Sequence, residues 1–204
     1  LKIEVDDKYN NIKSLFTKLA SLKIPNLDII VIHSNRKLRS FFEECKTKYS
    51  IVFPSHIKKV SSCAFKGSVS MTKISFTQPI ESIGNQSFSE CNSLEEIIIP
   101  STVKSIGNYA FNKCTSLKEI TIPSSVTEIR SFAFEGCTSL SKIIFDQNSS
   151  VSVIGNFAFA ECLTLKELTI PSSVTEIRPF VFKGCKSLEQ ITFENPSSIF
   201  ISFC

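Results

Sequence analysis

A segment of 23 residues recurs along most of this chain. In its clearest copy, residues 100–122 read PSTVKSIGNYAFNKCTSLKEITI. Similar segments occupy 54–76, 77–99, 123–145, 148–170 and 171–193, so these copies account for about two thirds of the 204 residues. Self-similarity at this period is typical of a solenoid, in which each repeat forms one coil and stacked coils bury a continuous core.

The end of each repeat predicts a β-strand. In the run LKEITI at 117–122, apolar residues alternate with polar ones, so we expect Ile120 and Ile122 to face the core and Glu119 and Thr121 to face solvent. A proline follows several of these runs. Because proline has no backbone N–H to donate to a strand ladder, the strand is expected to end and turn there.

The middle of each repeat predicts a second wall and a turn. Val103 and Ile106 return apolar side chains to the interior, and a short A-F-x-x-C turn follows them. Two columns run through the copies: Phe65, Phe88, Phe111, Phe134, Phe159 and Phe182, and Cys91, Cys114, Cys137, Cys162 and Cys185. Stacked coils are therefore expected to form a phenylalanine ladder and a cysteine ladder.

The chain has eight cysteines, and their placement predicts buried free thiols. Neighbouring coils lie roughly 4.8 Å apart, but cysteine side chains that run parallel into the core do not point toward each other as a disulfide requires. No C-x-x-C pair occurs, and His33 and His56 are the only imidazoles, so no metal site is predicted. No nucleophile elbow, P-loop, HExxH or dinucleotide-binding motif occurs either. We therefore predict no catalytic residues and no cofactor.

Residues 1–50 do not fit the repeat well and are predicted to be an N-terminal cap. Apolar residues recur at helical spacing over about 8–22, which favours an amphipathic helix, and a degenerate coil is visible over 29–53. Residues 51–204 form the solenoid, with six repeats and a partial seventh that reaches Cys204. The oligomeric state stays open, because the apolar residues after 198 fit either a cap over the last coil or a contact with another subunit.

The pattern I-P-x-x-V-x-x-I-x-x-x-A-F-x-x-C-x-S-L-x-x-I-x-I resembles the BspA-like leucine-rich repeat family. The resemblance covers about residues 54–193. It implies an α/β repeat fold: a leucine-rich repeat solenoid with a parallel β-sheet on the concave face, short turns or helices on the convex side and an N-terminal helical cap. It also implies a surface or secreted protein, an adhesin that binds host matrix or cell-surface ligands.

The candidate protein-binding face consists of the outward positions of the repeat strands. These are Lys73, Ser75, Glu96, Ile98, Glu119, Thr121, Lys142, Ile144, Glu167, Thr169, Gln190 and Thr192. Extended faces of this kind are where repeat proteins commonly bind partners. The favoured hypothesis is a non-catalytic protein-binding module. The alternatives are an intracellular scaffold or regulatory subunit in the cytoplasm and, least favoured, an enzyme.

Charge and loop length complete the sequence-based expectations. Residues 1–60 carry a net charge of +6 and the remainder −2, giving the total of +4. The basic segment fits a solvated cap or a surface for an acidic partner such as a sulfated glycan or anionic lipid. No interleaved aromatic and basic motif predicts nucleic-acid binding, and no apolar run is long enough to span a membrane. The copy at 148–170 follows two extra residues, so a bulging loop is predicted at 146–150. Asn85 and Asn148 begin N-x-S sequons.

Overall fold

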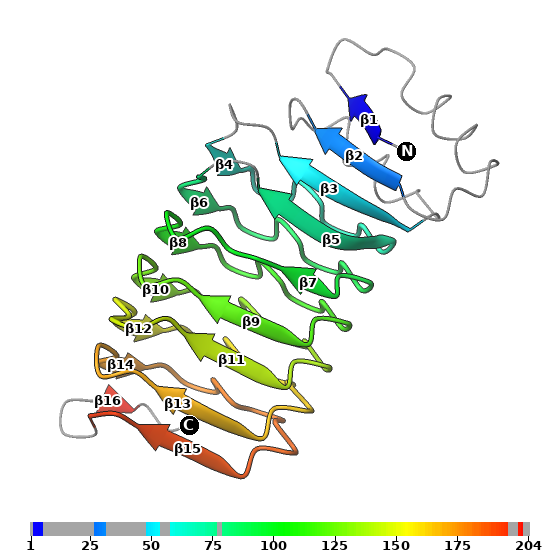
Figure 1. Cartoon of the computed structure of the whole chain (residues 1–204). Coiled ribbons are helices and arrows are strands. Elements are labelled where there is room, and N and C mark those ends of the chain that lie inside the picture. The colour runs from blue at the N-terminus through cyan, green and yellow to red at the C-terminus, as the bar shows by residue number, and fades with distance from the viewer. Residues whose placement is uncertain are drawn as a thin grey trace.

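The chain folds as a β-solenoid in which two rows of parallel strands run side by side along its length (Figure 1). The computed structural model describes residues 2–5, 27–31, 48–53, 58–76, 79–195 and 200–201. From β3 onward, each described coil contributes one strand to a front row and one two-residue strand to a second row. The turns between them close the coil around a common core.

The front row forms the predicted sheet. It comprises β1 (Lys2–Val5), β2 (Leu27–Val31), β3 (Tyr49–Phe53), β5 (Met71–Phe76), β7 (Glu96–Ile97), β9 (Glu119–Ile122), β11 (Lys142–Phe145), β13 (Glu167–Ile170) and β15 (Gln190–Phe193). The second row comprises β4 (Lys59–Val60), β6 (Ser82–Ile83), β8 (Ser105–Ile106), β10 (Glu128–Ile129), β12 (Val153–Ile154), β14 (Glu176–Ile177) and β16 (Phe200–Ile201). All pairings in both rows are parallel.

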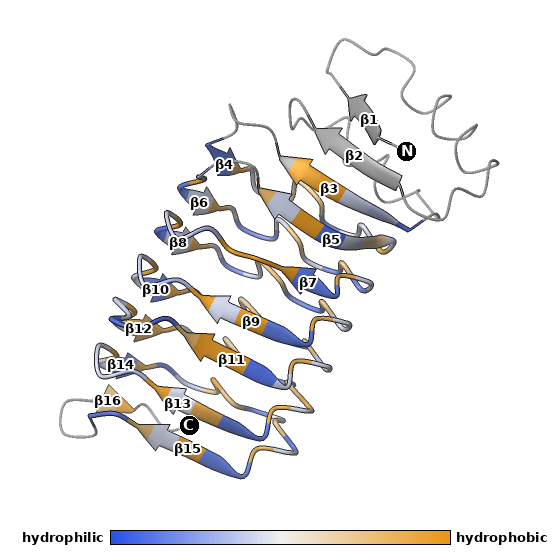
Figure 2. Cartoon of the chain, viewed as in Figure 1, coloured by the Kyte–Doolittle hydropathy of each residue, from blue (hydrophilic) through white to orange (hydrophobic). Residues whose placement is uncertain are grey.

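Strand register follows the repeat, so like residues stack on like. Ile120 of β9 lies opposite Ile143 of β11, and Ile106 of β8 lies opposite Ile129 of β10. Hydrophilic and hydrophobic residues alternate along β13 and β15, whereas in β11 three apolar residues follow Lys142 (Figure 2). A shift of one residue would turn every apolar side chain outward, and burial of one face therefore fixes this register.

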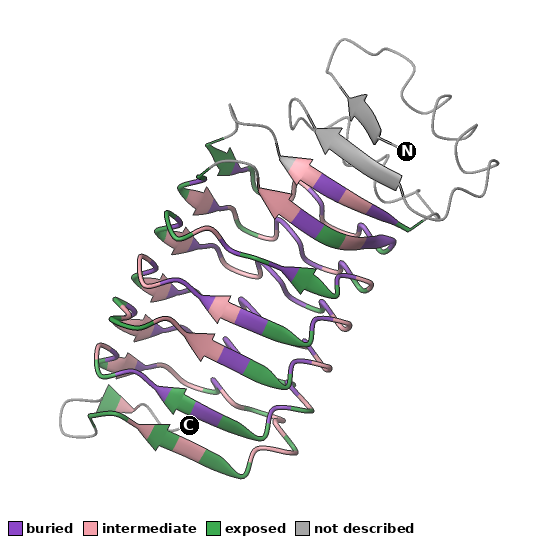
Figure 3. Cartoon of the chain, in the orientation of Figure 1, coloured by how far each residue is buried: buried purple, intermediate pink, exposed green. Residues whose placement is uncertain are grey.

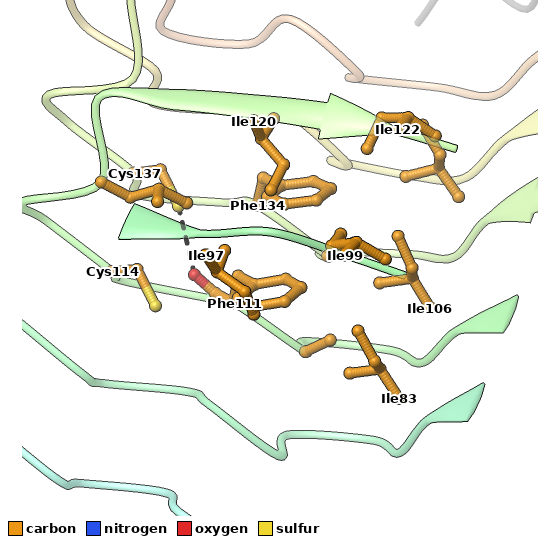
Figure 4. Close-up of a cluster of buried hydrophobic side chains, with 14 of the residues drawn as sticks. Ile83, Ile97, Ile99, Ile106, Phe111, Cys114, Ile120, Ile122, Phe134 and Cys137 are labelled. Carbon is orange, nitrogen blue, oxygen red and sulfur yellow. Dashed lines mark hydrogen bonds between the residues drawn. The ribbon is translucent and has the colours of Figure 1, made fainter. Parts of the chain in front are cut away.

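The predicted phenylalanine ladder fills the centre of the coils (Figure 4). Neighbouring rings stack almost in parallel, with centroids 5.2 Å apart for Phe111 and Phe134 and 5.5 Å apart for Phe65 and Phe88. From Phe65 to Phe159 the column is buried, whereas Phe182 at the last full coil is half-buried. The ladder thus runs through the described solenoid and loses cover only at its C-terminal end.

The cysteine column lies beside the rings and consists of free thiols, as predicted. Each thiol donates a hydrogen bond to the carbonyl oxygen of the preceding coil's phenylalanine; Cys137 Sγ, for example, lies 3.1 Å from the Phe111 oxygen (Figure 4). Cys114 makes the equivalent contact with Phe88 at 3.1 Å. The Phe111 oxygen also accepts a hydrogen bond from Cys114 N at 3.1 Å, so the Cys137 thiol is a second donor to a carbonyl that the turn already pairs, and the thiol itself is satisfied within the core. Cys45 and Cys204 lie outside the described residues.

Two expectations need correction. The convex connections of the described residues are turns, and those residues contain no helix; the hydrogen bonds of these turns instead join each coil to the next, as from Phe111 N to Ala133 O at 2.8 Å. The region taken as a cap contributes β1 and β2 in register with the solenoid sheet, since their β-branched residues pair as a continuing ladder. The helix predicted over 8–22 lies outside the described residues, and a domain boundary at residue 50 stays a prediction.

Candidate functional site

The strand face is the solvent-facing side of the front row of strands. Along these strands buried and exposed residues alternate, as predicted for a sheet with one wet side (Figure 3). In β13, for instance, Glu167 and Thr169 are exposed and Leu168 and Ile170 are buried. From β5 to β15, the alternation gives each coil two outward positions on one surface.

All twelve predicted face residues lie on this outward side. Those that are exposed are Lys73, Glu96, Ile98, Glu119, Lys142, Glu167, Thr169, Gln190 and Thr192, and those that are half-buried are Ser75, Thr121 and Ile144. Ile98 is 70% exposed, the highest value among the large hydrophobic side chains described. The face therefore combines charged, hydroxyl and apolar groups, although its use in binding stays a prediction.

Charge on the face is paired in its first part. Lys73 Nζ lies 3.0 Å from the Glu96 carboxylate across β5 and β7, and Lys142 Nζ lies 3.5 Å from Glu119 across β9 and β11. These pairs are exposed, so each contributes little to stability. The positive charge of each lysine is therefore already neutralised by a glutamate of a neighbouring coil.

The sheet under this face is interrupted at two points. One five-stranded sheet ends at β7, and β9–β11 and β13–β15 form separate two-stranded sheets. β11 and β13 are neighbours in space but are not joined by a strand ladder. The surface is hollowed across this second interruption.

The hollow has a volume of about 730 Å³ and extends over β11, β13 and β15. Six predicted face residues line it: Lys142, Ile144, Glu167, Thr169, Gln190 and Thr192. A smaller hollow of about 610 Å³ adjoins it and shares Ser141, Glu167 and Gln190. Six of the twelve predicted face residues thus line this hollow, and their use in binding stays a prediction.

The long loop at 146–150 forms one wall of the hollow. Asp146 N donates to Ile122 O at 3.0 Å and Ser150 N donates to Ser124 O at 3.1 Å, so both ends of the loop are held by the preceding coil. Gln147 and Asn148 between these anchors are exposed. The two extra residues therefore project as predicted, and the Asn148 sequon lies at the rim. The other sequon differs, because Asn85 Oδ1 accepts a hydrogen bond from Asn108 N at 2.9 Å.

The repeat pattern over residues 36–203 agrees with one family. The sequence matches the BspA type leucine-rich repeat region in six copies, over residues 36–150 and 104–203. The chain belongs to this family. Leucine-rich repeat proteins of this kind are generally binding modules without catalytic activity, and the chain is accordingly a protein-interaction repeat module.

Solved leucine-rich repeat proteins are similar to this chain, and one of them shares its fold. The leucine-rich repeat protein of T. pallidum is 27% identical over 76% of this chain and 72% of its own, with a TM-score of 0.52. One from Bacteroides ovatus is 25% identical over 78% of this chain, with a TM-score of 0.43. This chain spans 52% of the length of the Bacteroides protein. A search among curated proteins found no match.

Several residues around the hollow escaped the repeat-based prediction. They are Ser141, Asp146, Gln147, Asn148, Ser149, Thr164, Lys166, Pro171, Ser172, Glu189 and Glu194. Most of these residues lie just before or after a strand, whereas the prediction included only the outward positions within the strands. The sequence feature that could have indicated the hollow was the length of the 146–150 loop, because extra residues beside a sheet can form a wall along its surface.

Groups with perturbed titration lie away from this face. Among the described residues they are five core thiols and Glu135, whose pKa is raised chiefly by partial burial. The part of the chain that the structure describes holds no group of three or more His, Cys, Asp or Glu residues placed to bind a metal ion. No helix in that part is long and apolar enough to cross a membrane.

Proposed function

We propose that this chain is a non-catalytic protein-binding module of a surface or secreted adhesin, and that it binds a host matrix or cell-surface protein through the strand face. The observation that carries the proposal is the regular array of outward side chains on the strand face. This array is hollowed over β11, β13 and β15. Repeat proteins commonly use such extended faces, because each coil adds contacts at a fixed spacing.

The distribution of titratable groups supports a binding role over catalysis. Acid–base and nucleophilic catalysis depend on groups whose pKa is tuned at a cleft. In the described residues the shifted groups are core thiols and Glu135, and none of them lines either hollow. We therefore assign no catalytic residue and no cofactor.

One observation keeps a second candidate, an intracellular scaffold that binds a partner protein. All six cysteines among the described residues are free, which also suits a reducing compartment. Protease shaving of intact cells that express the full-length protein separates the two locations. Loss of the protein from the cell surface supports the adhesin, whereas protection until lysis supports the scaffold.

The binding face is tested with two matched triple variants. One places lysine at Thr121, Ile144 and Thr169 on the strand face, and the other places lysine at Ser105, Thr127 and Thr175 on the opposite wall, which is the second row of strands. Binding to a panel of immobilised matrix proteins and to fixed host cells is expected to fail with the first set only. Melting temperatures are expected to stay within roughly 2 °C, since outward residues add little to the core. Binding that survives the first set and fails with the second moves the site to the opposite wall.

A further inference from the structure

The hollow between β11 and β13 differs in charge from the rest of the strand face. Outside the hollow, the one lysine of the face, Lys73, lies 3.0 Å from Glu96 of the next coil. The hollow is lined by one lysine, Lys142, and by three carboxylates, Asp146, Glu167 and Glu194. Its formal charge is therefore −2 in a chain whose net charge is +4.

The only lysine of the hollow is already engaged. Lys142 Nζ lies 3.5 Å from the Glu119 carboxylate, on the side away from β13. No ion pair is found for Asp146, Glu167 or Glu194 within the described residues. Glu194 accepts one hydrogen bond, from Ser172 N at 2.9 Å. The hollow thus presents carboxylates that no cation of the described chain neutralises.

The remaining lining is apolar and hydroxyl-bearing. Ile144 and Phe145 are half-buried on the β11 side, and Thr169 and Thr192 present hydroxyl and methyl groups from β13 and β15. Gln190 Nε2 already donates to Thr192 Oγ1 at 3.2 Å. An occupant therefore meets an apolar surface flanked by separated negative charges.

We infer that this hollow binds a lysine- or arginine-bearing segment of the partner protein, an inference that rests on the proposed function of the strand face. The aliphatic stem of such a residue covers apolar surface while its cationic head reaches a carboxylate. The hollow's negative charge disfavours a sulfated glycan or an anionic lipid headgroup. A metal ion suits it less, because the described carboxylates do not converge on one point.

The test uses selection from a random library of displayed short peptides. The wild-type chain and the Glu167→Gln/Glu194→Gln double variant are used as parallel targets at low salt. We expect lysine and arginine to be enriched only on the wild type, and the selected peptides to lose about tenfold or more in affinity for the double variant. We also expect their affinity to fall as salt is raised, because the contact is ionic.

Glu95→Gln is the matched control, since Glu95 is an exposed carboxylate beside β7 and outside both hollows. The selected peptides should bind this variant as they bind the wild type, and melting temperatures should agree among all three proteins. Absence of basic enrichment on the wild type overturns the inference. Equal binding of the peptides to the double variant, or equal loss with Glu95→Gln, overturns it as well.

This result is distinguishable from failure of the proposed function. If the lysine set on the strand face abolishes binding to matrix proteins or cells while the peptides show no preference for basic residues, the strand face is the site and the charge inference is wrong. If basic peptides bind the hollow while binding to matrix proteins and cells is unchanged by the lysine set, the hollow binds cations but the adhesin function is wrong.

Discussion

Tyr109 and Phe132 stack face to face, with ring centroids 4.5 Å apart and planes 3° from parallel, although both residues have a positive φ. Phe157 and Phe180 extend this stack through two further coils, at 4.9 Å and 4.8 Å. Lys183 Nζ lies 5.7 Å and 5.6 Å from the rings of Phe157 and Phe180. Positive φ is unfavourable for large side chains. Ring stacking between coils therefore offsets a local backbone cost.

The first prediction concerns that offset, and it reverses the usual order of alanine and glycine. Both Phe157→Ala and Phe157→Gly remove the contacts with Phe132 and Phe180, but only glycine relieves the strain at a φ of 56°. We expect the glycine variant to be more stable than the alanine variant by roughly 0.5–1 kcal/mol in denaturant unfolding. Phe134, which has no positive φ, is the control position and should show the opposite order. An alanine variant of Phe157 at least as stable as the glycine variant would contradict the account.

The second prediction concerns the inner ladder. Phe134 is fully buried between Phe111 and Phe159, with centroids at 5.2 Å and 5.5 Å. Phe134→Ala should leave a cavity and lower the free energy of unfolding by about 3–5 kcal/mol. Phe182→Ala should cost less, because Phe182 is half-buried at the end of the column and lies 6.2 Å from Phe159. A loss under about 1 kcal/mol for Phe134→Ala in denaturant unfolding would show that the site refills or is not core.

The third prediction concerns thiol accessibility. Cys91, Cys114, Cys137 and Cys162 are buried, whereas Cys63 and Cys185 are partly exposed. A thiol reagent followed by mass spectrometry should therefore modify Cys63 and Cys185 in the native chain and the other four only after unfolding. Reducing and non-reducing gels of the native protein should look alike. Detection of a Cys114–Cys137 disulfide would contradict the parallel geometry of the column.

The fourth prediction is a loss of stability at alkaline pH. Burial raises the pKa of the Cys114 and Cys137 thiols well above their ordinary value of 9.0. The folded chain keeps these protons while the unfolded chain releases them, so the stabilisation is complete below pH 9 and is lost as pH rises above it. Each such thiol should add about 1.4 kcal/mol per pH unit to the decline above that point.

Cys137→Ala provides the measurement for this effect. The substitution lowers stability at every pH through the lost side chain, but its slope against pH should be smaller than that of the wild type by one thiol's contribution. Urea unfolding at a series of pH values from 8 to 10.5 gives both slopes. Identical slopes would mean that the Cys137 thiol does not stay protonated in the folded chain.

The strand positions, the phenylalanine column and the thiol column were predictable because each depends on local periodicity. Period-two alternation fixes which residues of a strand face inward, and an equal repeat length places Phe111 over Phe134 in any stacked arrangement. The outward placement of Lys142 and Glu167 follows from the same alternation. These patterns depend only on the alternation within a strand and on the repeat length, and both can be seen directly in the sequence.

The outer stack of Tyr109 and Phe132 was not predicted, although the sequence has an aromatic residue two positions before four of the six column phenylalanines. The positive φ and partial exposure of these aromatic residues depend on how each turn packs between its neighbouring coils, and the composition does not show that packing. The strands β1 and β2 were missed for a related reason. Their sequences depart from the repeat, and only pairing with β3 selects the extended form.

By itself, therefore, the sequence determined the coil, its core columns and the twelve outward positions, since each follows from a period of two or of 23 residues. Only the tertiary structure decided where that surface is hollowed. The break between β11 and β13, the loop held by Asp146 and Ser150, and the pairing of Lys142 with Glu119 arise between coils. These contacts join residues more than 20 positions apart in the sequence. Their geometry therefore depends on how one coil packs on the next.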